Sequence, residues 1–174
     1  IVDPGSGWLG RSPNLPGWEQ RNLAAILREA FGPSQVAVAN DVNAALYGEY
    51  RFGAGRGCRH LVMIALGTGV GGGVIVNGAL VTGHGHGAGE IGHMPLDLAG
   101  PPCACGNTGC LEAYCGSQGL LRRARELAAQ AGATAALREL VARGDGEMTT
   151  RQLYDLALAG DATGRRLFAE AGQR

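Results

Sequence analysis

The chain has 174 residues, of which 31 are glycine. This is more than twice the glycine content of an average protein, which is about 7%. A hydrophobic fraction of 45% and a balance of 15 basic and 15 acidic residues exclude a disordered chain, and the absence of a Gly-X-Y period excludes collagen. The net charge of zero argues against nucleic-acid binding by charge alone, so no nucleic-acid partner is expected.

Lysine is absent, and its absence excludes several classes of enzyme. All 15 basic residues are arginine, which excludes a Schiff-base lysine, a lysine general base and a Walker A loop. No apolar run approaches the roughly 18 residues of a membrane span, and the first residues do not resemble a signal peptide. We therefore expect a cytoplasmic protein without a membrane partner. The missing initiator methionine predicts a piece of a longer protein.

The first half of the chain has the pattern of an α/β protein. Helical spacing of apolar residues predicts a helix over 19–31, which a short buried strand over 35–39 follows. Asn40-Asp41 is then expected to open a second helix that runs to about residue 51. Apolar runs predict two further strands over 61–66 and 73–77. Asn77-Gly78 is typical of a tight hairpin turn before a last apolar run.

The second half of the chain is predicted to be helical. The pattern indicates helices over 111–130 and 133–143. Thr149 and Gln152 form a capping box that predicts the start of a further helix, and a last helix is expected after Asp161. The fold class is therefore α/β with a helical C-terminal part.

A glycine-rich segment at 67–73, Gly-Thr-Gly-Val-Gly-Gly-Gly, contains the pattern G-x-G-x-x-G. The β-branched residues after it favour a strand, whereas a dinucleotide fingerprint must lead into a helix. We interpret the segment as a loop between two strands whose N–H groups and threonine hydroxyl bind phosphate. A turn that serves chain geometry alone is the alternative. The predicted phosphate contacts are Gly67, Thr68, Gly69, Gly71, Gly72 and Gly73.

Asn40 and Asp41 stand between a predicted strand and a predicted helix. Ligands of open α/β sheets gather at such strand ends, and a carboxylate there can accept the proton of an attacking hydroxyl in phosphoryl transfer. Asn and Asp are also the favoured N-caps of helices, so capping is the alternative interpretation, which the pair taken alone favours, and the two roles are compatible.

A third motif has the spacing H-x9-C-x-C-x4-C. Three thiolates and one imidazole match a closed tetrahedral site for structural zinc, and the neighbouring glycines would let the chain fold around the ion. Buried free cysteines are the alternative. Cys58 and Cys115 fall outside the spacing and are expected to be packing residues. The predicted metal ligands are His93, Cys103, Cys105 and Cys110.

Two carboxylates, Glu90 and Glu112, stand on either side of this predicted metal loop. A loop fixed by a metal would hold them rigidly, as a site for the vicinal hydroxyls of a sugar requires. The alternative for Glu112 is a place in the first turn of its helix, where the helix dipole favours an acidic residue.

Together these motifs resemble the ROK family of repressors, open reading frames and sugar kinases. The resemblance rests on Asn-Asp-x-Asn-Ala, Gly-Thr-Gly-x-Gly-Gly-Gly, Gly-Glu-x-Gly-His and Cys-x-Cys-Gly-x-x-Gly-Cys-x-Glu, in this order. The segment over 12–18 also resembles the sugar-side segment of that family. The resemblance covers nearly the whole chain and is closest to the family's bacterial glucokinases.

The resemblance implies an actin-like, ribonuclease-H-like, two-domain sugar kinase that transfers phosphate from ATP to glucose. Residues 1–41 would belong to the small N-terminal α/β domain and 42–174 to the larger domain with the zinc loop. ATP, Mg²⁺ and structural Zn²⁺ are the implied cofactors, and the protein would be a homo-oligomer, dimeric or tetrameric. Asp41 becomes the general base. The implied sugar contacts are Asn14, Asn40, Glu90, His93 and Glu112.

Two motifs of the family are missing, namely Asp-x-Gly-Gly-Thr and the late glycine-rich adenosine-binding segment. We therefore expect that this chain by itself forms no complete ATP site. A sugar-responsive repressor of the same family and a zinc-stabilised sugar-binding module stay open as alternatives. Kinases for fructose, mannose, allose or N-acetylmannosamine, and polyphosphate as the donor, stay open as well.

Overall fold

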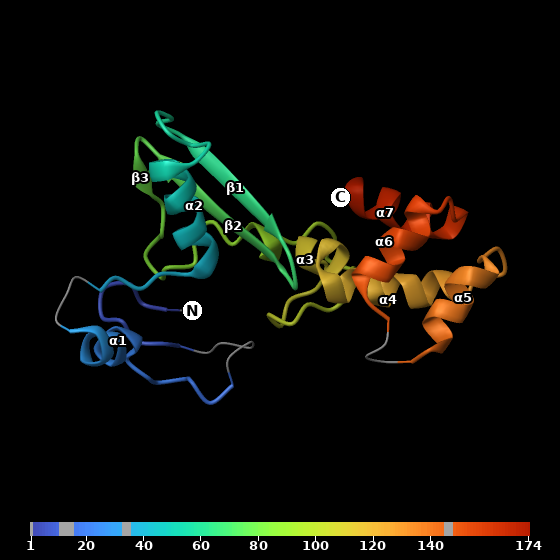
Figure 1. Ribbon diagram of the computed structural model, residues 1–174, viewed down its shortest axis with the longest axis horizontal. Coiled ribbons are helices and arrows are strands. Elements are labelled where there is room, and N and C mark those ends of the chain that lie inside the picture. Colours follow the sequence, from blue (N-terminus) through green and yellow to red (C-terminus); the bar gives the residue numbers. More distant parts are fainter. Residues whose placement is uncertain (1, 11–15, 33–35, 145–147) are drawn as a thin grey trace. The chain divides into compact units, whose positions relative to one another are not determined.

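The structure is a computed structural model, and it describes residues 2–10, 16–32, 36–144 and 148–174. The chain forms two compact units. The sheet unit comprises Ile1–Ala65 and Gly71–Ile91, and the helical unit comprises Leu66–Val70 and Gly92–Arg174. The predicted domain boundary after Asp41 stays a prediction. Figure 1 shows the elements α1 (Leu23–Phe31), α2 (Asp41–Phe52), β1 (Leu61–Leu66), β2 (Val70–Val76), β3 (Ala79–Leu80), η1 (Ile91–His93), α3 (Leu111–Cys115), α4 (Ser117–Ala128), α5 (Ala135–Ala142), α6 (Thr150–Leu158) and α7 (Ala162–Gly172).

The sheet has the strand order β1-β2-β3. β2 pairs antiparallel with β3, and Ile75 stands opposite Leu80. The connecting turn has φ values of 52° at Asn77 and 80° at Gly78, a left-handed conformation at both positions. Because a two-residue hairpin turn of this kind needs φ above zero at both central residues, the predicted Asn-Gly turn is confirmed.

The glycine-rich segment is not all loop, and this corrects the sequence prediction. β2 begins at Val70, so only residues 67–69 form a bend, and the three glycines after it lie in the strand. A Cβ atom at Gly71 would lie 2.3 Å from the Val42 side chain, and one at Gly73 would lie 2.7 Å from the Leu46 side chain. The glycines therefore allow α2 to lie directly on β2.

The predicted strand at 35–39 is wrong for residues 36–39, which adopt no regular secondary structure, and residue 35 lies outside the described residues. Val38 is buried against Val2, Leu9 and Ala24. The backbone carbonyl of Val36 accepts a hydrogen bond from Arg28 at 3.3 Å. The apolar residues are thus buried by packing near α1, whereas a strand needs a ladder of backbone hydrogen bonds to a neighbouring strand.

The helix predicted over 111–130 is divided into α3 and α4 at Gly116, which has extended backbone angles of −70° and 161°. The Ser117 N–H, which follows the break, donates to the carbonyls of Gly67 and Thr68. Periodicity could not reveal this break, because the helical spacing of apolar residues continues across it. The other predicted helices form with ends shifted by a few residues, as α1 from Leu23 and α5 over 135–142.

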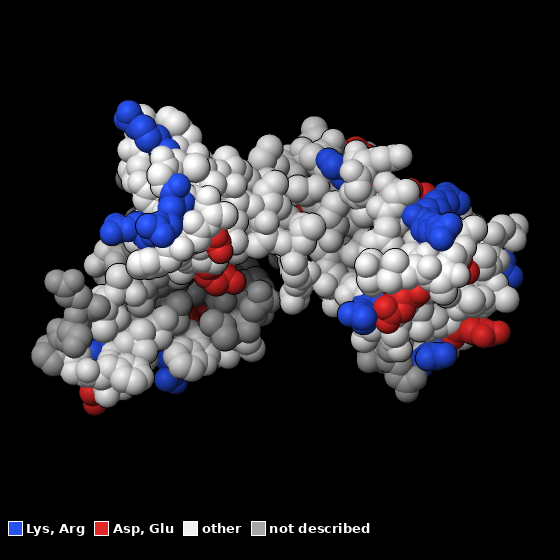
Figure 2. Space-filling model, turned by 45° about the horizontal axis from the view of Figure 1, so that its top comes forward, with Lys and Arg blue, Asp and Glu red and all other residues white. Residues whose placement is uncertain are grey.

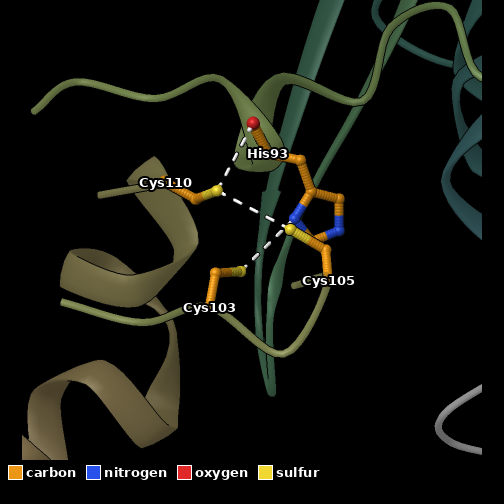
Figure 3. A group of neighbouring side chains, drawn as sticks. All are labelled: His93, Cys103, Cys105 and Cys110. Carbon is orange, nitrogen blue, oxygen red and sulfur yellow. Dashed lines mark hydrogen bonds between the residues drawn. The ribbon is translucent and has the colours of Figure 1, made fainter. Parts of the chain in front are cut away.

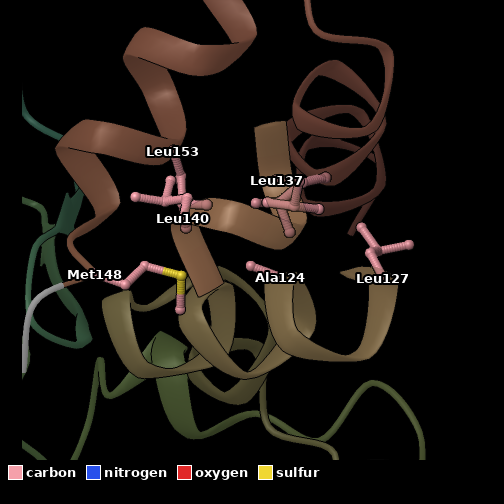
Figure 4. Packing of buried hydrophobic residues seen from close by; sticks show 7 residues of the cluster. Ala124, Leu127, Leu137, Leu140, Met148 and Leu153 are labelled. Carbon is pink, nitrogen blue, oxygen red and sulfur yellow. The ribbon is translucent and has the colours of Figure 1, made fainter. Parts of the chain in front are cut away.

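The core of the helical unit is built between α4, α5, α6 and α7, as Figure 4 shows. The capping box of Thr149 and Gln152 is present at the start of α6, and Asp161 caps α7 by accepting from the Gly164 N–H at 2.7 Å, so both predicted helix starts are confirmed. The buried residues of this core are Ala124, Leu127, Leu137, Leu140, Met148, Leu153 and Leu167.

Charged side chains on the helical unit are mixed in sign on the face that Figure 2 shows. Arginines pair with acidic residues one helical turn away or on a neighbouring helix, for example Arg151 with Asp155 and Arg123 with Glu170. The net charge is zero because the 15 arginines are balanced by 15 acidic residues. Among the described residues, no helix combines the length and the hydropathy that crossing a membrane requires.

Candidate functional site

Asn40 and Asp41 form the start of α2 in the sheet unit. The Asn40 side chain is the N-cap and accepts from the N–H groups of Val42 at 2.9 Å and Asn43 at 3.1 Å. The capping interpretation of Asn40 is therefore confirmed. Asp41 is not the cap, and its carboxylate is exposed. The packing of Val42 on Gly71 places this first turn of α2 beside the glycines of β2.

The segment that carries Glu90 lies against the other face of β2. A Cβ atom at Gly72 would lie 2.4 Å from the carbonyl oxygen of Gly89, so the backbone next to Glu90 crosses β2 in direct contact. Gly89 has a φ of 86°, which turns the chain at this crossing. The two strand faces thus place Asp41 and Glu90 on opposite sides of one glycine run in the sheet unit.

The glycine-rich bend, residues 67–69, belongs to the helical unit. The Gly67 N–H donates to the Gly69 carbonyl at 2.9 Å, and the Val70 N–H donates to Glu112 Oε2 at 2.9 Å. Within the described part of the chain, the N–H groups of Thr68 and Gly69 donate no hydrogen bond. Thr68 is exposed. Two successive free N–H groups beside a threonine hydroxyl are suited to bind an anion.

Glu112 of α3 and Ser117 of α4 form hydrogen bonds to this bend and to Val70, which follows it. Ser117 Oγ donates to the Gly67 carbonyl at 2.8 Å, and the Ser117 N–H donates to the Thr68 carbonyl at 3.1 Å. Glu112, in the first turn of α3, accepts from Val70 as described above, so its place in the helix and its contact with the bend are compatible. A Cβ atom at Gly69 would lie 2.1 Å from Glu112 Oε2, which explains the glycine there.

The four predicted metal ligands come together in the helical unit, where their donor atoms all lie within 4.8 Å of one another. Figure 3 shows the three sulfur atoms and the imidazole turned toward a common centre. The Cys103 Sγ lies 3.6 Å from His93 Nδ1, and the Cys105 Sγ lies 3.7 Å from the Cys110 Sγ. The loop that carries them, residues 93–110, is called the metal loop below.

These distances fit a tetrahedral zinc ion. Metal–sulfur bonds of about 2.3 Å place two sulfur ligands about 3.8 Å apart, and a metal–nitrogen bond of about 2.0 Å places nitrogen and sulfur about 3.5 Å apart. The donor set of three sulfurs and one nitrogen is also the one that zinc prefers in structural sites. His93 uses Nδ1 toward the cluster, which leaves Nε2 for another partner.

The protonation of the thiols also depends on this environment. Burial raises the pKa of the Cys110 thiol to about 12 and raises that of Cys103, whereas a hydrogen bond from the Asn107 backbone lowers that of Cys105. Two buried thiols with raised pKa values stay protonated near neutral pH unless a cation is bound, because a bound cation stabilises the thiolate.

The structure places the remaining predicted site residues as follows. Asn14 lies outside the described residues. Cys58 is exposed, so the prediction that it packs in the interior is wrong, whereas Cys115 is partly buried and contacts the Ala171 carbonyl at 3.3 Å. Neither cysteine joins the metal cluster.

Sequence reasoning missed Ser117 and assigned no role to Asn43. Ser117 follows a glycine inside a continuous helical pattern, and a Gly-Ser pair there was the available signal of a helix break. Asn43 is buried on α2, and its Oδ1 has no hydrogen-bond partner among the described residues. A polar residue on the apolar face of a predicted helix was the corresponding signal for Asn43.

Comparisons with known proteins agree with these motifs. A model described as the ROK family matches residues 1–166. A glucokinase from Thermotoga maritima is 42% identical over 125 residues, which cover 72% of this chain and 39% of that protein. A xylose repressor from Bacillus spizizenii is 39% identical over 105 residues, which cover 60% of this chain and 27% of that protein.

A solved structure is similar as well. The crystal structure of a ROK family glucokinase from Streptomyces griseus in complex with glucose and AMPPNP matches with a TM-score of 0.76 and 34% identity. The match covers 98% of this chain and 54% of that chain, so the present chain spans about half the length of its relative.

Proposed function

The chain belongs to the ROK family and has the actin-like, ribonuclease-H-like fold of its sugar kinases, and on this premise we propose that the protein is an ATP-dependent hexose kinase with glucose as its first substrate. The observation that carries the proposal is the bend at residues 67–69, which presents two free N–H groups and a threonine hydroxyl. Phosphoryl transfer depends mainly on positioning and on neutralising phosphate charge, and such a bend supplies both.

Asp41 is the proposed general base. Its exposed carboxylate, at the first position of α2, can accept the proton of a sugar hydroxyl while that oxygen attacks the terminal phosphorus of the donor. The N-terminus of α2 stabilises the negative charge of the carboxylate. Mg²⁺ bound to ATP would neutralise charge on the transferred phosphoryl group.

The predicted sugar contacts stay proposals, with Asn40 and Glu90 in the sheet unit and, separately, His93 and Glu112 in the helical unit. Asn40 uses its side-chain oxygen as a helix cap, so the amide N–H₂ group is the part it can offer to a hydroxyl. In this proposal zinc is structural and takes no part in the reaction. The protein is cytoplasmic in the proposal, since the cytoplasm supplies ATP and keeps thiols reduced.

Substitution of Asp41 tests the proposal in the full-length protein. Asp41→Asn should lower kcat about 10²- to 10⁴-fold with little change in glucose affinity, because the amide cannot accept the proton. The matched control is Asp155→Asn, which changes an exposed aspartate paired with Arg151 and should leave kcat unchanged. Retention of full turnover by Asp41→Asn would show that the base is another group.

The acceptor is tested with a panel of hexoses, each with ATP and with polyphosphate. Glucose is expected to give the largest kcat/KM with ATP. A larger kcat/KM with fructose, mannose or N-acetylmannosamine would support the proposed kinase activity and identify that sugar as the substrate in place of glucose, because such specificity rests on a few hydroxyl contacts.

A sugar-responsive repressor is the second candidate, favoured by the identity of 39% to the xylose repressor. The bend at 67–69 distinguishes the two, because a repressor has no need of free N–H groups for a phosphoryl donor. Absence of phosphorylation with every hexose, together with sugar-dependent DNA binding by the full-length protein, would establish the repressor instead.

A further inference from the structure

The break between α3 and α4 places Ser117 in hydrogen-bonding contact with the glycine-rich bend. Gly116 is extended, and a Cβ atom there would lie 3.3 Å from the Thr68 carbonyl oxygen, so the two backbone segments run in contact. Ser117 then makes three hydrogen bonds to the bend. Its hydroxyl donates to the Gly67 carbonyl at 2.8 Å, and its N–H donates to the same carbonyl at 3.3 Å and to Thr68 at 3.1 Å.

These bonds determine the direction of the free N–H groups. In a trans peptide the carbonyl and the following N–H point in opposite directions within one rigid plane. The Gly67 carbonyl faces Ser117, so the Thr68 N–H of the same peptide plane points away from it. The same holds for the Thr68 carbonyl and the Gly69 N–H. Both free donors are thereby turned away from α4.

The other N–H groups of this segment are already used. The Gly67 N–H is bonded to Gly69, and the Val70 N–H is bonded to the Glu112 carboxylate. The two ends of the bend are therefore fixed from α3 and α4, while the donors of Thr68 and Gly69 stay available. A preorganised pair of donors binds an anion better than a mobile pair, because no ordering is needed on binding.

We propose that Ser117 is a positioning residue for the phosphoryl donor, acting through the carbonyls of Gly67 and Thr68. The proposal rests on the proposed kinase function and extends it to a residue that touches neither sugar nor donor. Ser117 orients two peptide planes, and these planes present the N–H groups of Thr68 and Gly69 to a phosphate.

The test uses Ser117→Ala in the full-length protein. This variant removes the hydroxyl bond and keeps the backbone N–H bonds, so the KM for ATP should rise about three- to tenfold while the KM for the sugar is unchanged. Ser117→Thr keeps the hydroxyl and should restore most of the ATP affinity. A rise in both KM values to the same extent, or no restoration by threonine, would contradict the positioning role.

A matched control separates positioning from loss of stability. The Thr163 hydroxyl accepts from the Thr134 N–H at 3.1 Å, a contact between α7 and the start of α5 that does not involve the bend. Thr163→Ala should lower the unfolding temperature at least as much as Ser117→Ala does and leave the KM for ATP unchanged. An equal rise in the KM for ATP with Thr163→Ala would show that the effect of Ser117→Ala on this KM comes from lost stability and not from lost positioning.

Amide hydrogen exchange gives a readout that does not depend on activity. Ser117→Ala should speed exchange of the Gly67 amide, because its bond to Gly69 then lies in a looser bend, whereas Thr163→Ala should not. If the wild type phosphorylates no hexose, the proposed function fails, and exchange at Gly67 still decides whether Ser117 fixes the bend. Unchanged exchange together with an unchanged KM for ATP would overturn the inference.

Discussion

The metal loop and the glycine-rich bend belong to the same compact unit, and their conformations depend on different groups. In the metal loop, four side-chain donor atoms gather within 4.8 Å of one another. In the bend, backbone groups bond to Ser117 and Glu112, and a side chain on Gly69 would collide with Glu112. The metal loop is therefore expected to depend on ligand chemistry, and the bend on the space that glycine leaves.

The two segments are linked through the residues that flank them, and these contacts determine how far the contrast extends. A Cβ atom at Gly92, next to the ligand His93, would lie 1.8 Å from the Val70 carbonyl oxygen. Glu112 Oε1 lies 3.9 Å from the Cys103 Sγ, while its Oε2 accepts from Val70. A change in one segment can thus reach the other through these two contacts.

The largest effect is expected from loss of a metal ligand. Cys110→Ser should reduce bound zinc from about one ion per chain to much less, and it should lower the unfolding temperature by about 10 °C or more, because metal binding supplies folding free energy. Metal analysis and thermal unfolding measure the two effects. Cys58→Ser, at an exposed cysteine outside the cluster, is the control and should change neither. A stable, zinc-free wild type would contradict the metal site.

A substitution at the junction of the two segments should come next. Gly92→Ala forces the Val70 backbone to move and should cost about 2–4 kcal/mol of unfolding free energy. Gly132→Ala is the control, since no atom lies within 4 Å of a Cβ there and the expected change is within about 0.5 kcal/mol. Equal unfolding free energies for the two variants would show that the bend and the metal loop do not pack as described.

Removal of the Glu112 carboxylate should have a smaller effect. Glu112→Ala leaves the Val70 N–H without its acceptor and should cost about 1–3 kcal/mol of unfolding free energy, whereas Glu112→Gln keeps an acceptor and should cost less. Denaturant unfolding compares both with Glu139→Ala, an exposed glutamate on α5. If zinc content falls as well, the contact with Cys103 contributes to the metal loop.

The smallest effect is expected at an ion pair that belongs to neither segment. Arg123 Nε lies 2.7 Å from Glu170 Oε2, and this bond holds the pKa of Glu170 below its ordinary value. A lowered carboxyl pKa stabilises the fold above the pKa of the unfolded chain, and this contribution is lost as the pH falls. Glu170→Gln should therefore cost less than about 1 kcal/mol at neutral pH, because the pair is partly exposed.

The same variant gives the pH dependence. The difference in unfolding free energy between wild type and Glu170→Gln should be constant above about pH 6 and should narrow below about pH 4.5. Asp155→Asn, in a more exposed pair, should show a smaller difference over the same range. A difference that widens as the pH falls would contradict the assigned direction of the Glu170 pKa shift.

Local patterns predicted well where the interaction is local in the chain. The capping box at Thr149, the Asn-Gly turn and the start of α2 at Asn40-Asp41 each involve residues a few positions apart, and the structure confirms all three. The clustering of His93 with three cysteines was also predictable, because its ligands lie within one loop with spacing typical of zinc sites.

The misses concern contacts over long distances in the sequence. Apolar residues at 36–39 suggested a strand, yet a strand exists only with a hydrogen-bonded neighbour, and these residues pack near α1 instead. The apolar periodicity did not show the break at Gly116 for the same reason, since the Ser117 N–H bonds to residues about 50 positions earlier, and the Gly-Ser pair was the only local signal of it.

By itself, the sequence determined the glycine excess, the lack of lysine, the order of the motifs and the residues able to bind metal or phosphate, because these depend on side-chain chemistry and short spacing. Only the tertiary structure decided what the glycines are for. The glycines at 71 and 73 leave space for α2 to pack on β2, and the glycine at 69 leaves space for the Glu112 carboxylate. The tertiary structure also determines which N–H groups of the bend stay free, because this depends on which distant carbonyls and carboxylates lie against the bend.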